Sequence, residues 1–155
     1  MTTSSDDTQE SHQARVNREL IELLNELRVA LPGVQVLFAF LLAVPFSAGY
    51  SKIEPFQRDV FFMTLVATAI STAFFIAPSA YHRWHFRKHE KEQLLGTSNI
   101  FALIGILFLA ISMVGVVVLV TDVIYSQELA IASGTFAVLL FGGLWAALPL
   151  WRRRD

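Results

Sequence analysis

The chain has 155 residues, of which 54% are hydrophobic and 16% are charged, and its mean hydropathy is +0.53. Soluble domains carry about 25% charged residues, so a water-soluble fold of this composition would lack polar surface. The formal net charge of −1 argues against nucleic acid as a partner, and a chain without cysteine has neither disulfides nor thiolate chemistry.

The first 31 residues divide into two parts. Residues 1–13, MTTSSDDTQESHQ, are small, polar and acidic, which predicts a disordered tail. Residues 14–31 predict an amphipathic helix at the membrane interface, because apolar residues recur there every three or four positions. These residues are Val16, Leu20, Leu23, Leu24, Leu27 and Leu31. Pro32 lacks an amide hydrogen and disfavours helical geometry at Leu31, so we expect a bend at Pro32–Gly33.

The net charge of this amphipathic helix is zero, because it contains three arginines and three glutamates. The arginines are Arg15, Arg18 and Arg28, and the glutamates are Glu19, Glu22 and Glu26. Pairs at a spacing of four, such as Arg15 with Glu19 and Arg18 with Glu22, can form ion pairs. Helices that bind anionic lipid are usually rich in Lys and Arg, so this helix is as well suited to packing against protein as to lying on lipid.

Four long stretches contain no Asp, Glu, Lys or Arg. They are residues 29–51, 60–82, 93–121 and 129–151. Each reaches the ~20 residues that a helix needs to cross a bilayer. We therefore predict an all-α membrane protein with four transmembrane helices and an N-terminal cytoplasmic amphipathic helix. The predicted transmembrane domain covers 32–151, with spans at about 33–50, 60–81, 99–121 and 129–150, and a basic tail follows at 152–155.

The basic residues predict the orientation of these spans. With four spans both termini lie on one side, and that side holds every Lys and Arg except Lys52 and Arg58. We therefore expect a multi-pass protein of the inner or plasma membrane, with both termini in the cytoplasm.

Small and hydroxyl side chains let helices approach closely in lipid. In the second span Thr64, Thr68 and Thr72 recur every four residues. In the fourth span Gly134 follows Ala130 at the same spacing, and Gly142 and Gly143 precede Ala146 and Ala147. We expect the second and fourth spans to pack centrally and the third, which is more uniformly apolar, to face lipid.

The cores of the spans carry no ionisable residue, whereas proton and ion pathways usually need one. Gln35, about one turn into the first span, is the nearest polar candidate. Its amide suits an interhelical hydrogen bond or a contact with a bound ligand.

Three histidines, His82, His85 and His89, would share one face if the second helix continues past Tyr81. Such spacing can bind zinc, but the neighbouring Arg83, Arg87 and Lys88 would repel a dication. A pH-sensing role is a second reading, since histidine titrates near neutrality. A third is a basic cytoplasmic loop that contacts anionic headgroups and sets the topology.

Two segments carry a resemblance to a known family. They are RELIELLNELRVALPGVQVLFAFLLAVPF at 18–46 and APSAYHRWHFR at 77–87. With them the chain resembles a family of small four-span bacterial membrane proteins, a domain of unknown function common in actinobacteria. The resemblance implies similarity from about Asn17 to Trp151, and some relatives carry automatic labels as sodium–proton antiporters.

These observations favour a non-enzymatic accessory or scaffold that acts through helix packing and a cytoplasmic docking face. The candidate residues of that face are Glu26, Arg28, Gln35, His82, Arg83 and Arg87. The alternative is a small, oligomeric transporter or channel, for example a proton/cation antiporter. We expect no cofactor, no metal and no catalytic residue, and we expect the lipid bilayer, a second copy or another membrane protein as partner.

Overall fold

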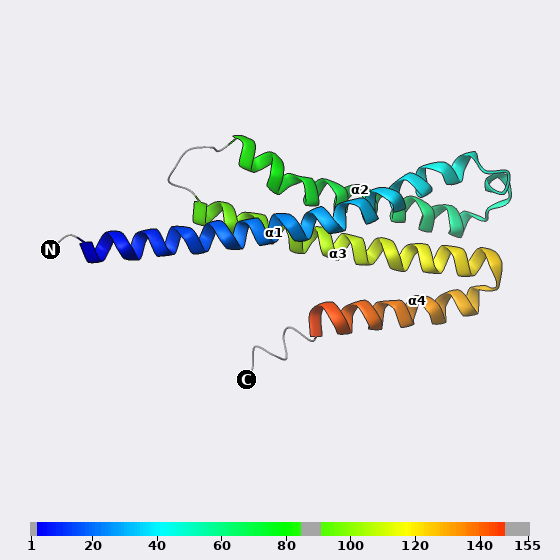
Figure 1. Cartoon of the computed structure of the whole chain (residues 1–155). Helices are drawn as coiled ribbons and strands as arrows, with labels where there is room; N and C mark the ends of the chain where they lie inside the picture. The colour runs from blue at the N-terminus through cyan, green and yellow to red at the C-terminus, as the bar shows by residue number, and fades with distance from the viewer. Residues whose placement is uncertain (1–2, 85–90, 148–155) are drawn as a thin grey trace.

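The computed structural model describes the backbone at residues 3–84 and 91–147 and the side chains at 14–80 and 96–145. These residues form four α-helices and no strand (Figure 1). The helices are α1 (Thr3–Ala43), α2 (Pro55–Trp84), α3 (Lys91–Ile124) and α4 (Gln127–Gly142). Two short 3-10 helices, η1 (Val44–Phe46) and η2 (Tyr50–Lys52), join α1 to α2, and a π-helical turn, η3 (Gly143–Ala147), extends α4.

All four helices contain segments long and apolar enough to cross a membrane. These segments are Ala14–Phe46, Pro55–Ala80, Gly96–Ile124 and Gln127–Trp145. The predicted all-α architecture with four spans is therefore confirmed, and the protein is a multi-pass membrane protein. The chain runs up and down, so that the start of α1 and the end of η3 lie at one end of the bundle (Figure 1). We call this the terminal end, and the end with the α1–α2 and α3–α4 turns the hairpin end.

Helix α1 differs from the two parts expected for this region, because it runs without a break from Thr3 to Ala43 with Pro32 inside it. Its 41 residues correspond to about 61 Å at ~1.5 Å per residue, twice the ~30 Å of a hydrocarbon core. From Thr3 onward, helix therefore takes the place of the disordered tail that was expected for residues 1–13.

Helix α1 continues through Pro32, where a break was expected, because the packed face of α1 continues on both sides of it. Leu20, Leu27, Val34 and Leu41 are buried and lie seven residues apart. Pro32 is exposed, so its ring does not interrupt this seam. A proline inside a helix costs about 3 kcal/mol, and the contacts of the seam offset that cost.

The centre of the bundle is the contact between α2 and α3. Six buried residues of α2 alternate at spacings of three and four, namely Phe61, Thr64, Thr68, Ser71, Phe75 and Pro78, and Ala67 is buried beside Thr68. Opposite them, α3 buries small residues, namely Ser98, Ala102, Gly105 and Ser112. A repeat of three and four residues is the pattern of helices that cross at about 20° in a left-handed sense. The two helices pack so closely because one of them presents almost no side-chain volume.

Helix α1 closes over this pair from one side. Leu27 and Val34 of α1 form a buried apolar cluster with Phe75 of α2 and Ala102 of α3. The cluster joins the first three helices near the start of the first span. Leu27 precedes and Val34 follows Arg28, which is the last charged residue of α1.

The second span lies centrally as predicted, but its main partner is the third span and not the fourth. Helix α3 packs against α1, α2 and α4, whereas α4 packs, among the described elements, against α3 and its own extension η3. The reason lies in the glycines of α3. A side chain at Gly105 would meet the Phe75 ring of α2 and one at Gly115 would meet Thr64 of α2, so α3 admits α2 unusually closely.

A pair of glycine-to-alanine variants tests the close contact. A Cβ at Gly105 would lie 2.6 Å from Phe75 Cδ1 and Cε1, whereas a Cβ at Gly142 meets nothing within 4 Å. Both variants gain the same helix propensity, so their difference isolates the contact. We expect Gly105→Ala to be less stable than Gly142→Ala by about 1–3 kcal/mol, measured by reversible unfolding in mixed micelles. Equal stabilities would contradict the close approach of α2 to α3 at this level.

Candidate functional site

Polar groups buried between α2 and α3 form hydrogen bonds at two levels of the bundle. Thr68 Oγ1 and Ser112 Oγ are hydrogen-bonded across the two helices. Thr68 Oγ1 also donates to the Thr64 carbonyl at 2.7 Å, and Ser112 Oγ lies 3.4 Å from the same oxygen. One turn further, Ser71 Oγ donates to the Gly105 carbonyl at 2.8 Å. No buried polar side-chain atom lacks a partner in the part of the chain with described side chains.

These hydrogen bonds involve part of the predicted threonine set and two residues that the sequence reasoning missed. Thr64 and Thr68 take part in them, whereas Thr72 is half-buried and donates to the carbonyl of Thr68 in its own helix at 2.8 Å. Ser71 and Ser112 were missed, although both are fully buried. The alternation of three and four residues along α2 was the signal that could have found Ser71, because a strict repeat of four drifts off the packed face.

The predicted glycines of the fourth span divide in the same way. Gly134 is buried, and a Cβ there would lie 2.6 Å from Val118 Cγ2 of α3. Near it Ser133 Oγ donates to Thr121 Oγ1 of α3 at 3.2 Å. Gly142 and Gly143 face open space, so the structure does not bring them to a helix interface within this chain.

At the hairpin end a glutamine fastens α2 to α3. Gln57 Nε2 donates to Asp122 Oδ2 at 2.9 Å, and Gln57 Oε1 accepts from the backbone amide of Glu54 at 3.1 Å. Hydrogen bonds to an ionised carboxylate are stronger than neutral ones. The same side chain thus orders the start of α2 and the end of α3.

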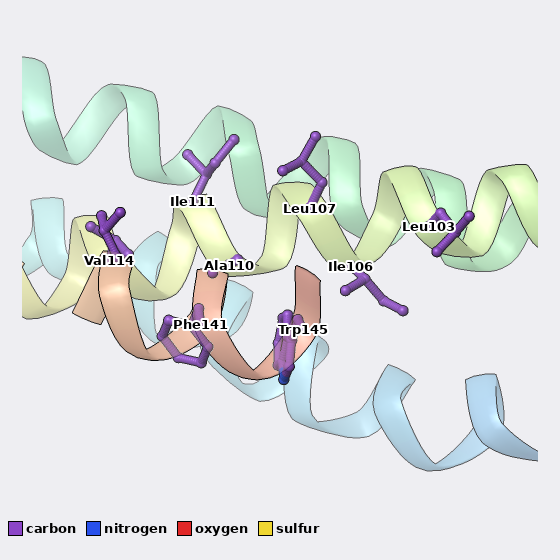
Figure 2. Close-up of a pocket in the computed structure, with 10 residues that line it drawn as sticks. Leu103, Ile106, Leu107, Ala110, Ile111, Val114, Phe141 and Trp145 are labelled. Atoms are coloured by element: carbon purple, nitrogen blue, oxygen red, sulfur yellow. The ribbon is translucent and has the colours of Figure 1, made fainter. Parts of the chain in front are cut away.

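A cavity of about 560 Å³ opens between α3 and α4. Figure 2 shows its walls, which come from α3 on one side and from α4 and η3 on the other. The lining residues are Leu103, Ile106, Leu107, Ala110, Ile111, Val114, Val138, Phe141, Gly142 and Trp145. The rings of Phe141 and Trp145 lie 5.0 Å apart. Because the lining carries no ionisable group, the cavity suits hydrocarbon rather than an ion.

The candidate docking residues on α1 all face away from the bundle. Glu26, Arg28 and Gln35 are exposed. Arg15 Nε donates to Glu19 Oε1 at 2.8 Å, which is the first of the two ion pairs expected on this helix. Within the described side chains, the second expected pair, Arg18 with Glu22, does not form.

The side chains of the other predicted docking residues lie outside the described part of the chain. His82 and Arg83 belong to α2, but their side chains lie outside the described part of the chain, and Arg87 lies outside it altogether. The same holds for the candidate histidines at 85 and 89. Elsewhere, among the residues that are described, no group of His, Asp and Glu could hold a metal ion.

A known family model covers most of the chain. A model of a family of unknown function, DUF6328, matches residues 9–149. The chain belongs to this family. The match begins within α1 and ends just after η3, so the DUF6328 domain comprises most of α1 and all of the other three helices. No curated protein and no solved structure matches the chain.

The predicted resemblance to a domain of unknown function is thus confirmed. The actinobacterial origin and the antiporter labels of relatives stay predictions.

A double-mutant cycle tests the hydrogen bond between Thr68 and Ser112. Thr68→Val and Ser112→Ala each remove one partner of the bond across the helices, so their effects on unfolding should not add. We expect a coupling energy of about 0.6 kcal/mol and at most about 1.7 kcal/mol, the range measured for such bonds in membranes. Thr72→Val is the matched control, since its hydroxyl bonds within α2, and its cycle with Ser112→Ala should be additive. Coupling in the control cycle alone would contradict the assignment.

Proposed function

We propose that this membrane protein is a non-enzymatic accessory or scaffold that docks another protein on the water-exposed half of α1. The supporting observation is that α1 is one continuous helix which the bundle holds firmly. Leu27 and Val34 pack into the buried cluster with Phe75 and Ala102, and Leu23 packs beside them. The charge-free run of α1 begins at Val29. The 26 residues from Thr3 to Arg28 that precede it extend about 39 Å along the helix axis.

The charges on this half of α1 favour a partner with basic side chains. Glu22 and Glu26 are exposed and lie one turn apart, and neither makes an ion pair with the described part of the chain. Glu19, one turn before Glu22, already forms an ion pair with Arg15. Complementary charge across an interface steers association and selects the partner.

The interior of the bundle supports a structural role rather than a chemical one. The hydroxyl groups between α2 and α3 are engaged in hydrogen bonds to neighbouring helices or to their own helix, and the cavity between α3 and α4 is lined by hydrocarbon. A transporter or channel would need a polar path through the spans, and no observation on the described helices favours one.

We further propose that the terminal end of the bundle faces the cytoplasm. Helix α1 begins and η3 ends at that end (Figure 1). Ten of the twelve Lys and Arg residues lie in the segments that precede the first span, join the second to the third, or follow the fourth. Cytoplasmic segments carry an excess of Lys and Arg.

Neutralising the two free carboxylates tests the docking role. Glu22→Gln with Glu26→Gln should lower the recovery of a co-purifying protein about tenfold, since exposed charge pairs contribute up to ~1 kcal/mol each. Recovery is measured by gentle extraction from the native membrane and intact-complex mass. Glu54→Gln with Glu128→Gln is the matched control, because it removes the same charge from exposed residues at the hairpin end.

Equal recovery from both double variants would contradict docking at Glu22 and Glu26. A protein that purifies alone and carries an ion flux in reconstituted vesicles would contradict the scaffold proposal as a whole.

A further inference from the structure

Gln35 is an amide on the lipid-facing side of α1. It is exposed and lies seven residues beyond Arg28, which is about 10 Å further along the helix axis. No hydrogen bond from its side chain to any other described residue is formed. An amide without a partner is costly in hydrocarbon, where no water can replace the missing bond.

A second exposed polar residue shows how this cost is otherwise avoided. Thr135 of α4 is also exposed within an apolar span, but its Oγ1 donates to the Ile131 carbonyl at 2.8 Å. Threonine can satisfy itself within its own helix in this way, whereas the longer amide of Gln35 has two donors and an acceptor to place. The partner of Gln35 therefore has to come from outside the bundle.

The surface around Gln35 is shaped for a second helix. Pro32, Gln35, Ala39 and Leu42 are exposed and alternate at spacings of three and four. Such a repeat is the pattern by which helices pack along a shared seam. Ala39 carries little side-chain volume one turn beyond the amide, so a neighbouring backbone can approach closely there.

We propose that this face of α1 is an interface between two copies of the chain, with the Gln35 amides hydrogen-bonded to each other. An amide both donates and accepts, so it is complementary to itself. A twofold axis between two copies inserted in the same direction brings a residue on the axis next to its own equivalent. Residues 14–31 of α1 have equal numbers of Arg and Glu, so this part of two copies side by side is not repelled by a net charge.

This interface goes beyond the proposed docking role and does not depend on it. The docking residues Glu22 and Glu26 lie on the water-exposed half of α1, whereas Pro32 to Leu42 belong to its apolar half. The two proposals can therefore fail separately.

Cysteine cross-linking locates the interface, because the chain has no cysteine of its own. Oxidation of Ala39→Cys in native membranes should give a covalent dimer in high yield. Phe136→Cys on α4, which is 67% exposed, is the matched control and should stay monomeric. A monomer from Ala39→Cys, or equal dimer from both variants, would overturn the proposed face.

Energy transfer between labelled copies in lipid vesicles then tests the amide itself. Gln35→Leu should lower the dimer association constant about 3- to 30-fold, the range expected for interhelical hydrogen bonds in membranes. Thr135→Val should leave the constant unchanged, because that hydroxyl already has a partner in its own helix. An unchanged constant for Gln35→Leu would overturn the role of the amide.

Co-purification separates this inference from the docking role. A monomer that still carries a foreign partner would overturn the dimer alone. A dimer that forms through Ala39→Cys without any foreign partner would support this inference while contradicting the proposed function.

Discussion

The close approach of α2 to α3 is the constraint on which the rest of the bundle depends. In lipid there is no hydrophobic gain from bringing two apolar helices together, so the free energy of their association comes from dispersion contacts and hydrogen bonds. Gly105 makes room for the Phe75 ring, and at the neighbouring turns Thr68 and Ser112 share a hydrogen bond. Helix α1 rests on the ridge that these two helices form, and α4 is attached, within the described part of the bundle, through α3.

The number of spans and the turns between them could be predicted from the sequence because charge is expelled from the hydrocarbon regardless of packing. Charge-free runs therefore mark the spans, and the helices match them. The faces of the spans were harder to predict for the same physical reason. Lipid and protein interior are both apolar, so the long apolar side chains of α3 do not distinguish its packed side from its exposed side. Small and hydroxyl residues such as Ser71 and Gly105 mark the packed side instead.

Local rules also failed where packing overrides them. Proline disfavours the helix at the preceding residue, yet α1 continues because Leu27 and Val34 are held in one cluster on either side of Pro32. Conversely, the small residues at the end of α4 predict a packing motif, although a Cβ at Gly142 would meet no described atom within 4 Å and the residue lines a cavity. Of the candidate docking face, the α1 residues have a defined position, and Gln35 proved to lie on the outside of the bundle rather than between its helices.

The continuity of α1 also has a mechanical consequence. A helix that is continuous across the bilayer surface acts as a lever, so a tilt of its apolar half is carried to its other end. Spans adjust their tilt to the thickness of the surrounding bilayer. With about 39 Å of helix beyond Val29, a change in tilt of ~10° displaces the far end by about 7 Å. The position of that end above the membrane therefore depends on the lipid in which the protein is embedded.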